Sequence, residues 1–157
     1  MDKIYGAIER MDGIQRIGDE TFEVFYGFGE DENGKFQYRQ VLSFMPPLDF
    51  VKSMIIAQIN DNIHEKITCG FKWKGHLVWL DESNQRNYAR DYAVGNIPTY
   101  KFGTDTEPVF YTFEDFNEFN DFSKAWAKHI SDTVADGWEE KANIDWIVYD
   151  SKNVRQS

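Results

Sequence analysis

The sequence predicts an α+β fold in which β-hairpins and helices follow one another in blocks. Three observations support this class. Segments rich in aromatic and β-branched residues flank polar turns such as Asn33-Gly34, which is typical of hairpins. Apolar residues recur every three or four positions after Pro46-Pro47 and again after Asp115, which is typical of helices. No strand–helix–strand repeat is visible, which argues against a parallel sheet.

The first 45 residues are expected to form an N-terminal β-hairpin unit. Thr21–Phe28 is rich in β-forming residues, and Lys35–Phe44 returns with the same character. The polar stretch 30–34 between them is predicted to be the hairpin tip. Ile4–Arg10 is a candidate further strand, with a turn around Asp12-Gly13.

Pro46-Pro47 is the predicted boundary between a β-rich docking segment, residues 1–45, and a mixed α+β domain, residues 46–157. Two consecutive prolines lack N–H donors, so no central strand is expected to pass through them. The stripe after them predicts a helix, and Asn60-Asp61-Asn62 is expected to end it. Its members are Leu48, Val51, Ile55, Ile59 and Ile63.

Two more hairpins are expected, with a short helix between them. Ile67–Leu80 alternates around a turn at Lys74-Gly75, which places Ile67, Cys69, Phe71 and Trp73 on one face. Thr99–Phe102 and Val109–Thr112 flank Gly103-Thr104-Asp105.

The short helix is expected to run to about Ala93, with Asp81 or Ser83 as its cap and Gly95-Asn96 after its end.

A long C-terminal helix is expected next. Thr112-Phe113-Glu114-Asp115 is a variant of the capping box, and the helix should end near Gly137. A short helical turn or strand is expected at Trp146–Tyr149, before a polar tail, Ser151–Ser157. The predicted buried stripe of the long helix contains Phe116, Phe119, Phe122 or Ser123, Trp126, Ile130, Val134 and Trp138.

Composition excludes several classes of protein. The 157 residues include 17 Lys and Arg against 27 Asp and Glu, so the net charge of −10 disfavours binding to nucleic acid. The single cysteine excludes an internal disulfide. No apolar run approaches the ~18 residues of a membrane span, and the first residues lack the pattern of a signal peptide. The 13 Phe, 8 Tyr and 5 Trp are a high aromatic content, and because such side chains both fill cores and anchor interfaces, some of them are expected to contact a partner.

No catalytic residue, metal ligand or cofactor site is predicted. His64-Glu65 begins like a zinc-protease helix, but position 68 is Thr where a second His is needed. Cys69 and His76 form a possible thiol–imidazole pair, although the apolar pattern favours packing for Cys69. Acidic pairs suited to glycoside hydrolysis lie at caps and turns, where carboxylates are favoured for structural reasons.

The predicted interface candidates fall into three groups. Strand aromatics are one group, because a small sheet cannot bury both of its faces. The acidic hairpin tip is the second, because it can steer docking to a basic neighbour. An amide-rich cluster is the third, and it serves either helix capping, which is favoured, or contact with a partner or sugar. The groups are Tyr5, Tyr26, Tyr38, Tyr111 and Trp73, then Glu30, Asp31 and Glu32, then Asn84, Gln85 and Asn87.

Residues 48–146 resemble a bacteriophage and prophage domain of unknown function. That domain is often encoded beside, or fused to, tail-fibre and tail proteins, notably in phages of gut Bacteroidetes. The resemblance implies phage origin and no active site, and it does not extend to residues 1–45. It lies in the clusters Gly70-Phe71-x-Trp73-x-Gly75, Val78-Trp79-Leu80, Asn84-Gln85-x-Asn87-Tyr88, Pro98–Gly103, Glu107-Pro108-Val109, Gly137–Lys141 and Ile144-Asp145-Trp146.

The expected function is that of a structural or adaptor component of a phage particle, in the tail, neck or fibre attachment. Its expected partners are other phage structural proteins and copies of itself in a ring, with no nucleic acid and no membrane. The expected location is the virion, after synthesis in the host cytoplasm. The alternatives are an assembly factor that leaves the particle, an acidic DNA mimic that binds host proteins, and a small polysaccharide hydrolase.

Overall fold

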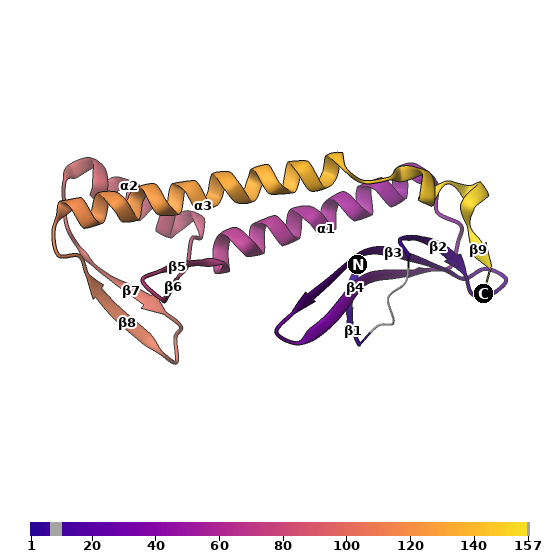
Figure 1. The fold of residues 1–157 in the computed structure, drawn as a ribbon, viewed down its shortest axis with the longest axis horizontal. Helices are drawn as coiled ribbons and strands as arrows, with labels where there is room; N and C mark the ends of the chain where they lie inside the picture. Colours follow the sequence, from indigo (N-terminus) through magenta and orange to yellow (C-terminus); the bar gives the residue numbers. More distant parts are fainter. Residues whose placement is uncertain (7–10, 157) are drawn as a thin grey trace. The chain divides into compact units, whose positions relative to one another are not determined.

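The computed structural model confirms the α+β class and describes residues 1–6 and 11–156. The chain forms two compact units (Figure 1). Unit 1 comprises Met1–Ile59 and Asn143–Ser157, and unit 2 comprises Asn60–Ala142. These units do not follow the predicted division at Pro46-Pro47, because the helix after the prolines contributes to both and the C-terminal tail returns to unit 1.

Unit 1 is built on a five-stranded sheet with the strand order β1-β4-β3-β2-β9. The strands are β1 (Asp2–Tyr5), β2 (Gly13–Arg16), β3 (Phe22–Asp31), β4 (Gly34–Leu42) and β9 (Arg155–Gln156). The long β3–β4 hairpin turns where Asp31 pairs with Gly34, which confirms the predicted tip.

The expected strand Ile4–Arg10 corresponds only in part to β1. That strand begins at Asp2 and ends at Tyr5, and residues 7–10 lie outside the described residues. The predicted turn at Asp12-Gly13 is wrong for Gly13, because that residue begins β2 opposite Phe25.

A β-bulge in the β3–β4 hairpin is fixed by a side chain from outside the hairpin. Pairing shifts between Tyr26 and Phe28, and Gly27 has φ +66°, a conformation that favours glycine. The Gly27 amide donates to Asp12 Oδ1 over 2.9 Å. Burial raises the pKa of Asp12, although the Gly27 amide opposes this effect. The bulge therefore depends on a contact that local sequence does not reveal.

The polar tail is not a free end. It forms the 3-10 turn η2 (Ser151–Asn153) and then β9, which pairs parallel to β2. Arg155 donates from Nη1 to the Asp12 carbonyl over 3.0 Å and from Nη2 to the Met11 carbonyl over 2.7 Å. Just upstream, the expected turn at Trp146–Tyr149 is confirmed as the 3-10 helix η1, and the Tyr149 hydroxyl donates to the Phe25 carbonyl over 2.7 Å.

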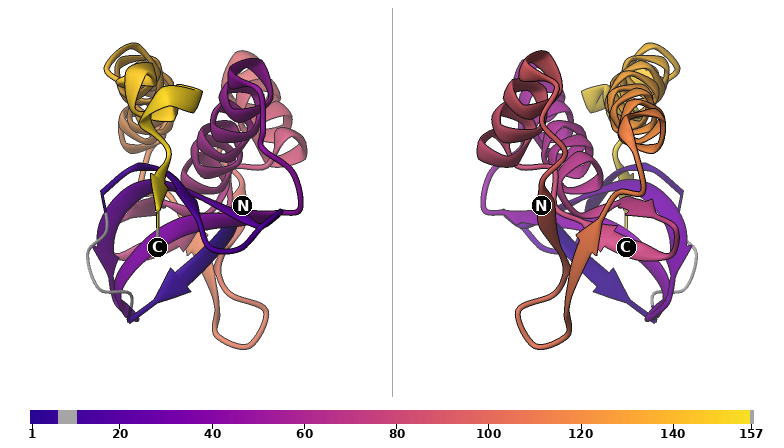
Figure 2. Two further views of the ribbon diagram at one scale, coloured as in Figure 1. Left: turned by 90° about the vertical axis from the view of Figure 1, so that its right-hand side faces the viewer. Right: turned by 90° about the vertical axis from the view of Figure 1, so that its left-hand side faces the viewer.

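Helix α1 (Leu48–Cys69) is longer than the sequence predicts. Its first half lies over the sheet of unit 1 (Figures 1 and 2), with Val51, Ile55 and Ile59 fully buried. The helix continues through Asn60-Asp61-Asn62, where an end was expected. It persists because its second half packs in unit 2, and such packing outweighs weak local propensity.

In unit 2, the second half of α1 runs antiparallel to the end of α3 (Phe116–Ala142) (Figure 1). A Cβ on Gly137 would lie 2.2 Å from Ile63 Cδ1, so the two helices touch where glycine provides room. Lys141 donates to Asn60 one turn further along α3, and His129 Nε2 lies 2.9 Å from the Lys66 carbonyl on the other side. The predicted end near Gly137 is therefore wrong, because that glycine serves close packing.

The other elements of unit 2 are β5 (Phe71–Trp73), β6 (His76–Val78), α2 (Glu82–Val94), β7 (Thr99–Gly103) and β8 (Pro108–Thr112). The hairpins β5–β6 and β7–β8 form around the expected turns. The first hairpin is shorter than predicted, because Ile67 and Cys69 belong to α1. Helix α2 has the predicted cap Asp81 and the predicted glycine after its end, Gly95, with φ +72°.

The core of unit 2 is largely aromatic. Phe122 contacts Phe102, Phe113 and Phe71 at ring-centroid distances of 5.6, 5.1 and 6.2 Å. Trp126 packs against this core as predicted, but Trp138 does not, because it is 66% exposed while Gly137 takes the buried position beside it. The buried cluster is Phe71, Val78, Leu80, Tyr88, Phe102, Phe113, Phe119 and Phe122.

Candidate functional site

An aromatic and ionic surface forms on unit 1 near the tip of the β3–β4 hairpin. We call it the ribbon patch, and it consists of Lys3, Tyr5, Asp31, Phe36 and Tyr38. The register explains why these side chains share one face, because Lys3 pairs with Tyr38 and Tyr5 pairs with Phe36. Strand β1 is an edge strand of the sheet, so the patch lies at an edge.

An ion pair holds the patch together. Lys3 Nζ lies 2.7 Å from Asp31 Oδ2, and the Tyr5 hydroxyl donates to the same oxygen over 2.8 Å. The hydrogen bond to Asp31 raises the pKa of Lys3, and the reverse effect lowers the pKa of Asp31. Both groups are therefore charged near neutral pH, so the ion pair between Lys3 and Asp31 persists under these conditions.

Aromatic stacking orders the rest of the patch. The rings of Tyr5 and Phe36 meet edge to face at 6.1 Å, and those of Phe36 and Tyr38 at 5.7 Å. Lys3 Nζ lies 4.0 Å from the centroid of Phe36, a cation–π distance. A Cβ on Gly29 would lie 2.5 Å from Phe36 Cζ, so the ring lies directly on the glycine backbone. Tyr5 nevertheless remains 41% exposed.

The structure thus unites three predicted interface residues, Tyr5, Tyr38 and Asp31, with Lys3 and Phe36. Glu30 and Glu32 are exposed at the same hairpin tip, where Glu30 pairs with Lys35 and, by alternation with Asp31, lies on the other face of the hairpin. Tyr26 does not fit the interface prediction, because it is only 6% exposed. All residues from Phe22 to Tyr26 are buried, since β3 is a central strand covered on both faces.

A second candidate site is an open pocket of about 420 Å³ in unit 2. We call it the Trp79 pocket. Trp79 follows β6 and points away from the core, since Val78 and Leu80 on either side of it are fully buried. Its indole N–H donates to the Gly103 carbonyl over 3.2 Å, which fixes the ring beside β7. The lining residues are Trp79, Asp81, Asn84, Lys101, Gly103 and Asp105.

Hydrogen bonds orient the polar side chains of the pocket. Asp81 Oδ1 accepts from the backbone N–H of Asn84 over 2.7 Å, and the side-chain Nδ2 of Asn84 donates to the Trp79 carbonyl over 2.9 Å. Lys101 Nζ lies 2.7 Å from Asp105 Oδ1, and this contact lowers the pKa of the highly exposed Asp105. The side chains are therefore directed by their own chain before any ligand arrives.

The amide cluster divides between structure and site. Gln85 Nε2 donates to the Leu80 carbonyl over 2.7 Å, which is the structural role that was favoured. Asn84 has a structural bond and also lines the pocket. Asn87 is half-buried on α2, and Trp73 is half-buried against the core, with its ring 5.5 Å from Phe122.

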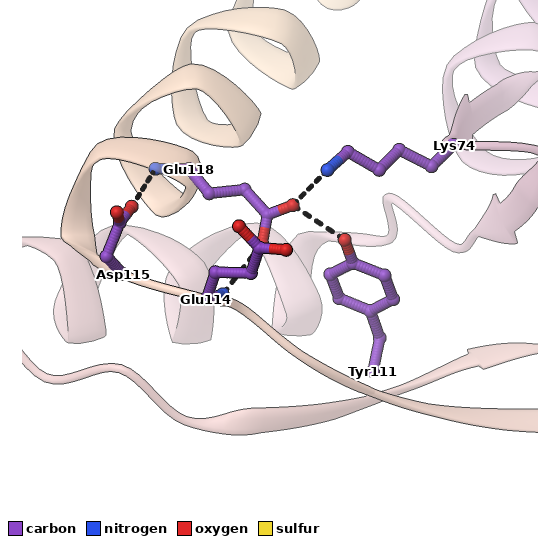
Figure 3. A network of polar contacts seen from close by, with 5 residues as sticks. All are labelled: Lys74, Tyr111, Glu114, Asp115 and Glu118. Carbon is purple, nitrogen blue, oxygen red and sulfur yellow. Dashed lines mark hydrogen bonds and ion pairs between the residues drawn. The ribbon is translucent and has the colours of Figure 1, made fainter.

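A polar network joins the β5–β6 turn, β8 and the start of α3 (Figure 3). One oxygen of Glu118 pairs with Lys74 and accepts from the Tyr111 hydroxyl over 2.7 Å. Its other oxygen accepts from the Glu114 amide over 2.9 Å, and Asp115 Oδ1 accepts from the Glu118 amide over 2.9 Å. Burial by itself raises the pKa of Glu118, but Lys74 and Tyr111 outweigh it and the pKa is lowered. All of these bonds are internal, which assigns the network to holding the fold.

The predicted cap of the long helix is corrected by this network. Asp115, not Thr112, caps α3. The Thr112 hydroxyl instead shares a hydrogen bond of 2.7 Å with Thr99 across the β7–β8 hairpin. An acidic residue three positions before Glu118 was a visible alternative signal in the sequence.

The sequence predicts no site role for Trp79 and Lys101, which line the Trp79 pocket together with the predicted candidate Asn84. The alternation Val78-Trp79-Leu80 could have indicated this position, because it places the Trp79 side chain on the outer face if Val78 and Leu80 belong to the core.

The predicted thiol–imidazole pair is not favoured at Cys69. Burial and Glu65 raise the pKa of the Cys69 thiol, which disfavours the thiolate that nucleophilic catalysis needs.

Comparison with protein-family models, curated proteins and solved structures finds no match. The resemblance to the phage domain therefore stays a prediction. Among residues 1–6 and 11–156, no helix combines the length and apolar character needed to cross a membrane. Within the same residues, no three His, Cys, Asp or Glu side chains gather as metal ligands would.

Proposed function

We propose that this chain is a structural or adaptor component of a bacteriophage particle that acts through protein–protein contacts. The observation that carries the proposal is the ribbon patch, an ordered aromatic surface at a sheet edge with Tyr5 41% exposed. Aromatic side chains are enriched at protein interfaces, and an ordered patch loses little entropy on docking. The phage context comes from the resemblance of residues 48–146.

Charge defines the partner surface that fits the patch. Glu30 and Glu32 are exposed at the same hairpin tip, and the whole chain carries a net charge of −10. A neighbouring subunit with an apolar surface and a basic rim complements this arrangement. The partner is therefore another particle protein with basic side chains next to an apolar depression.

The first test is mass spectrometry of purified particles from the phage that encodes the chain. The expected result is the chain at a fixed whole-number ratio to the major capsid protein, as symmetric assembly requires. Absence from purified particles overturns the proposal and favours an assembly factor.

The second test connects the patch to incorporation. Replacement of both Tyr5 and Tyr38 by Ala is expected to lower the copy number in particles at least about tenfold, since interface aromatics carry much of the binding energy. Phe110→Ala is the matched control, because Phe110 is 72% exposed in unit 2, outside the patch. Equal incorporation of the two variants, with unchanged circular dichroism, contradicts the role of the patch.

A further inference from the structure

We propose that the Trp79 pocket binds a neutral saccharide, with one pyranose ring stacked on the indole of Trp79. The pocket lies within unit 2, and the ribbon patch lies within unit 1. The inference is therefore independent of the proposed docking role.

The first argument is the aromatic wall. Trp79 is 41% exposed and lines the pocket, while its N–H is already bonded to Gly103. An indole held by its edge offers its apolar surface to a ligand without losing further side-chain entropy. A pyranose ring has an apolar face of C–H groups that covers such a surface.

The second argument is the balance of donors and acceptors. The internal bonds use one oxygen of Asp81, one oxygen of Asp105 and the amide nitrogen of Asn84. The second carboxylate oxygens and Asn84 Oδ1 have no hydrogen-bond donor among the residues that the structure describes. These three acceptors suit a ligand with several hydroxyl donors, and Lys101 can donate to a hydroxyl oxygen.

The third argument is charge. Two carboxylates line the pocket with one ammonium group, and the chain as a whole is strongly acidic. An anionic sugar or a phosphate is therefore repelled. Lys101 opposes the binding of a simple cation, because its ammonium group already pairs with the Asp105 carboxylate. A neutral polyhydroxyl ligand avoids both penalties.

The backbone supports the same geometry. Gly103 has φ +79°, and a Cβ there would lie 2.3 Å from the Glu107 carbonyl. Only glycine fits this tight turn, which places the Gly103 carbonyl against the indole and Asp105 at the rim. The pocket volume of about 420 Å³ falls within the range of small-ligand sites.

The test is a nuclear magnetic resonance titration of the full chain with four probes. These are the methyl glycosides of glucose, mannose and galactose, and N-acetylglucosamine. At least one is expected to shift the indole N–H signal of Trp79 and the amide signal of Asn84 in a saturable way, with a Kd of about 1 mM. Glucose 6-phosphate and lysine methyl ester serve as the anionic and cationic comparisons.

Variants locate the site. Trp79→Ala is expected to weaken binding at least about tenfold, and Asp105→Asn by about threefold to tenfold, as for loss of one hydrogen-bond acceptor. The side chain of Asp105 is 98% exposed, so Asp105→Asn is expected to leave the fold intact. This variant therefore still tests the site if Trp79→Ala does not fold. Trp138→Ala is the matched control, because Trp138 is an exposed tryptophan of the same unit.

Three outcomes overturn the inference: no saturable shift with any neutral sugar, tighter binding of either charged comparison ligand, or equal binding by the Asp105→Asn variant and the unchanged chain. The presence or absence of the chain in particles has no bearing on these results, so the two proposals fail separately.

Discussion

The contact between Gly137 and Ile63 gives a prediction with opposing terms. Gly137 lies inside α3, where replacing glycine by alanine in an isolated helix stabilises it by about 1 kcal/mol. Here the new Cβ would lie 2.2 Å from Ile63 Cδ1 and 2.7 Å from its Cγ1. Both distances are far below van der Waals contact, and relief of such overpacking costs about 1–3 kcal/mol.

Gly137→Ala is therefore expected to lower the free energy of unfolding by about 1 kcal/mol, the difference between a cost of about 2 and a gain of about 1. Ile63→Ala removes both carbons that clash. In that background the same Gly137→Ala change is expected to raise the free energy of unfolding by about 1 kcal/mol, so the coupling between the two positions is about 2 kcal/mol.

The assay is denaturant unfolding of the four proteins of this cycle, followed by far-ultraviolet circular dichroism. Ala135→Gly is the matched control, because Ala135 is exposed on the same helix and reports helix propensity alone. The reasoning is refuted if Gly137→Ala stabilises the unaltered chain by as much as Ala135→Gly destabilises it. Equal effects of Gly137→Ala in both backgrounds refute it as well.

Three further predictions concern polar contacts. Burial raises the pKa of Glu118, but Lys74 and the other partners lower it by more, so the folded pKa lies below the unfolded value of about 4.3. The ionised Glu118 therefore stabilises the fold above the unfolded pKa, and this contribution is lost as the pH falls through the folded pKa. Glu118→Gln is therefore expected to be less stable at neutral pH, with the difference disappearing in acid. Tyr149→Phe removes the bond to the Phe25 carbonyl and is expected to cost about 1 kcal/mol in denaturant unfolding. Arg155→Lys is expected to speed hydrogen exchange in β2, because one ammonium group cannot replace the two-pronged guanidinium contact.

Each of these predictions has a control or a contradicting result. Glu114→Gln keeps the backbone amide that Glu118 uses, so it should leave the acid limb of the stability curve unchanged. A Glu118→Gln difference that persists at low pH would contradict the assigned cause. An unchanged Tyr149→Phe variant would mean that the buried hydroxyl contributes nothing net. Slow exchange of β2 in Arg155→Lys would show that charge alone suffices there.

Local signals determined many elements of this fold. Turn residues at 30–34 fixed the position of the long hairpin, and Asp81 and Gly95 fixed both ends of α2. The 3-10 turn at Trp146–Tyr149 also lies where it was expected. Caps and turns are readable because they depend on bonds between residues a few positions apart.

The candidate sites were only partly predictable. Tyr38 is partly exposed, as strand alternation predicts, but Tyr26 is buried. Alternation indicates on which face of a strand a side chain lies, but it does not indicate whether that face is covered by other elements. Tyr5 joins Tyr38 only through the register of β1 on β4. The Trp79 pocket needs contact between Trp79 and Gly103, which no periodic pattern indicates.

By itself, the sequence determined the α+β class, the hairpin turns and the caps of the short helix. Only the tertiary structure decided that α1 continues past Asn60-Asp61-Asn62, that α3 continues past Gly137, and that Arg155 joins the sheet as β9. In each of these cases a contact between distant segments stabilises the element by more than its local sequence disfavours it. Helix ends and edge strands respond to packing partners, and those partners are known only once the chain has folded.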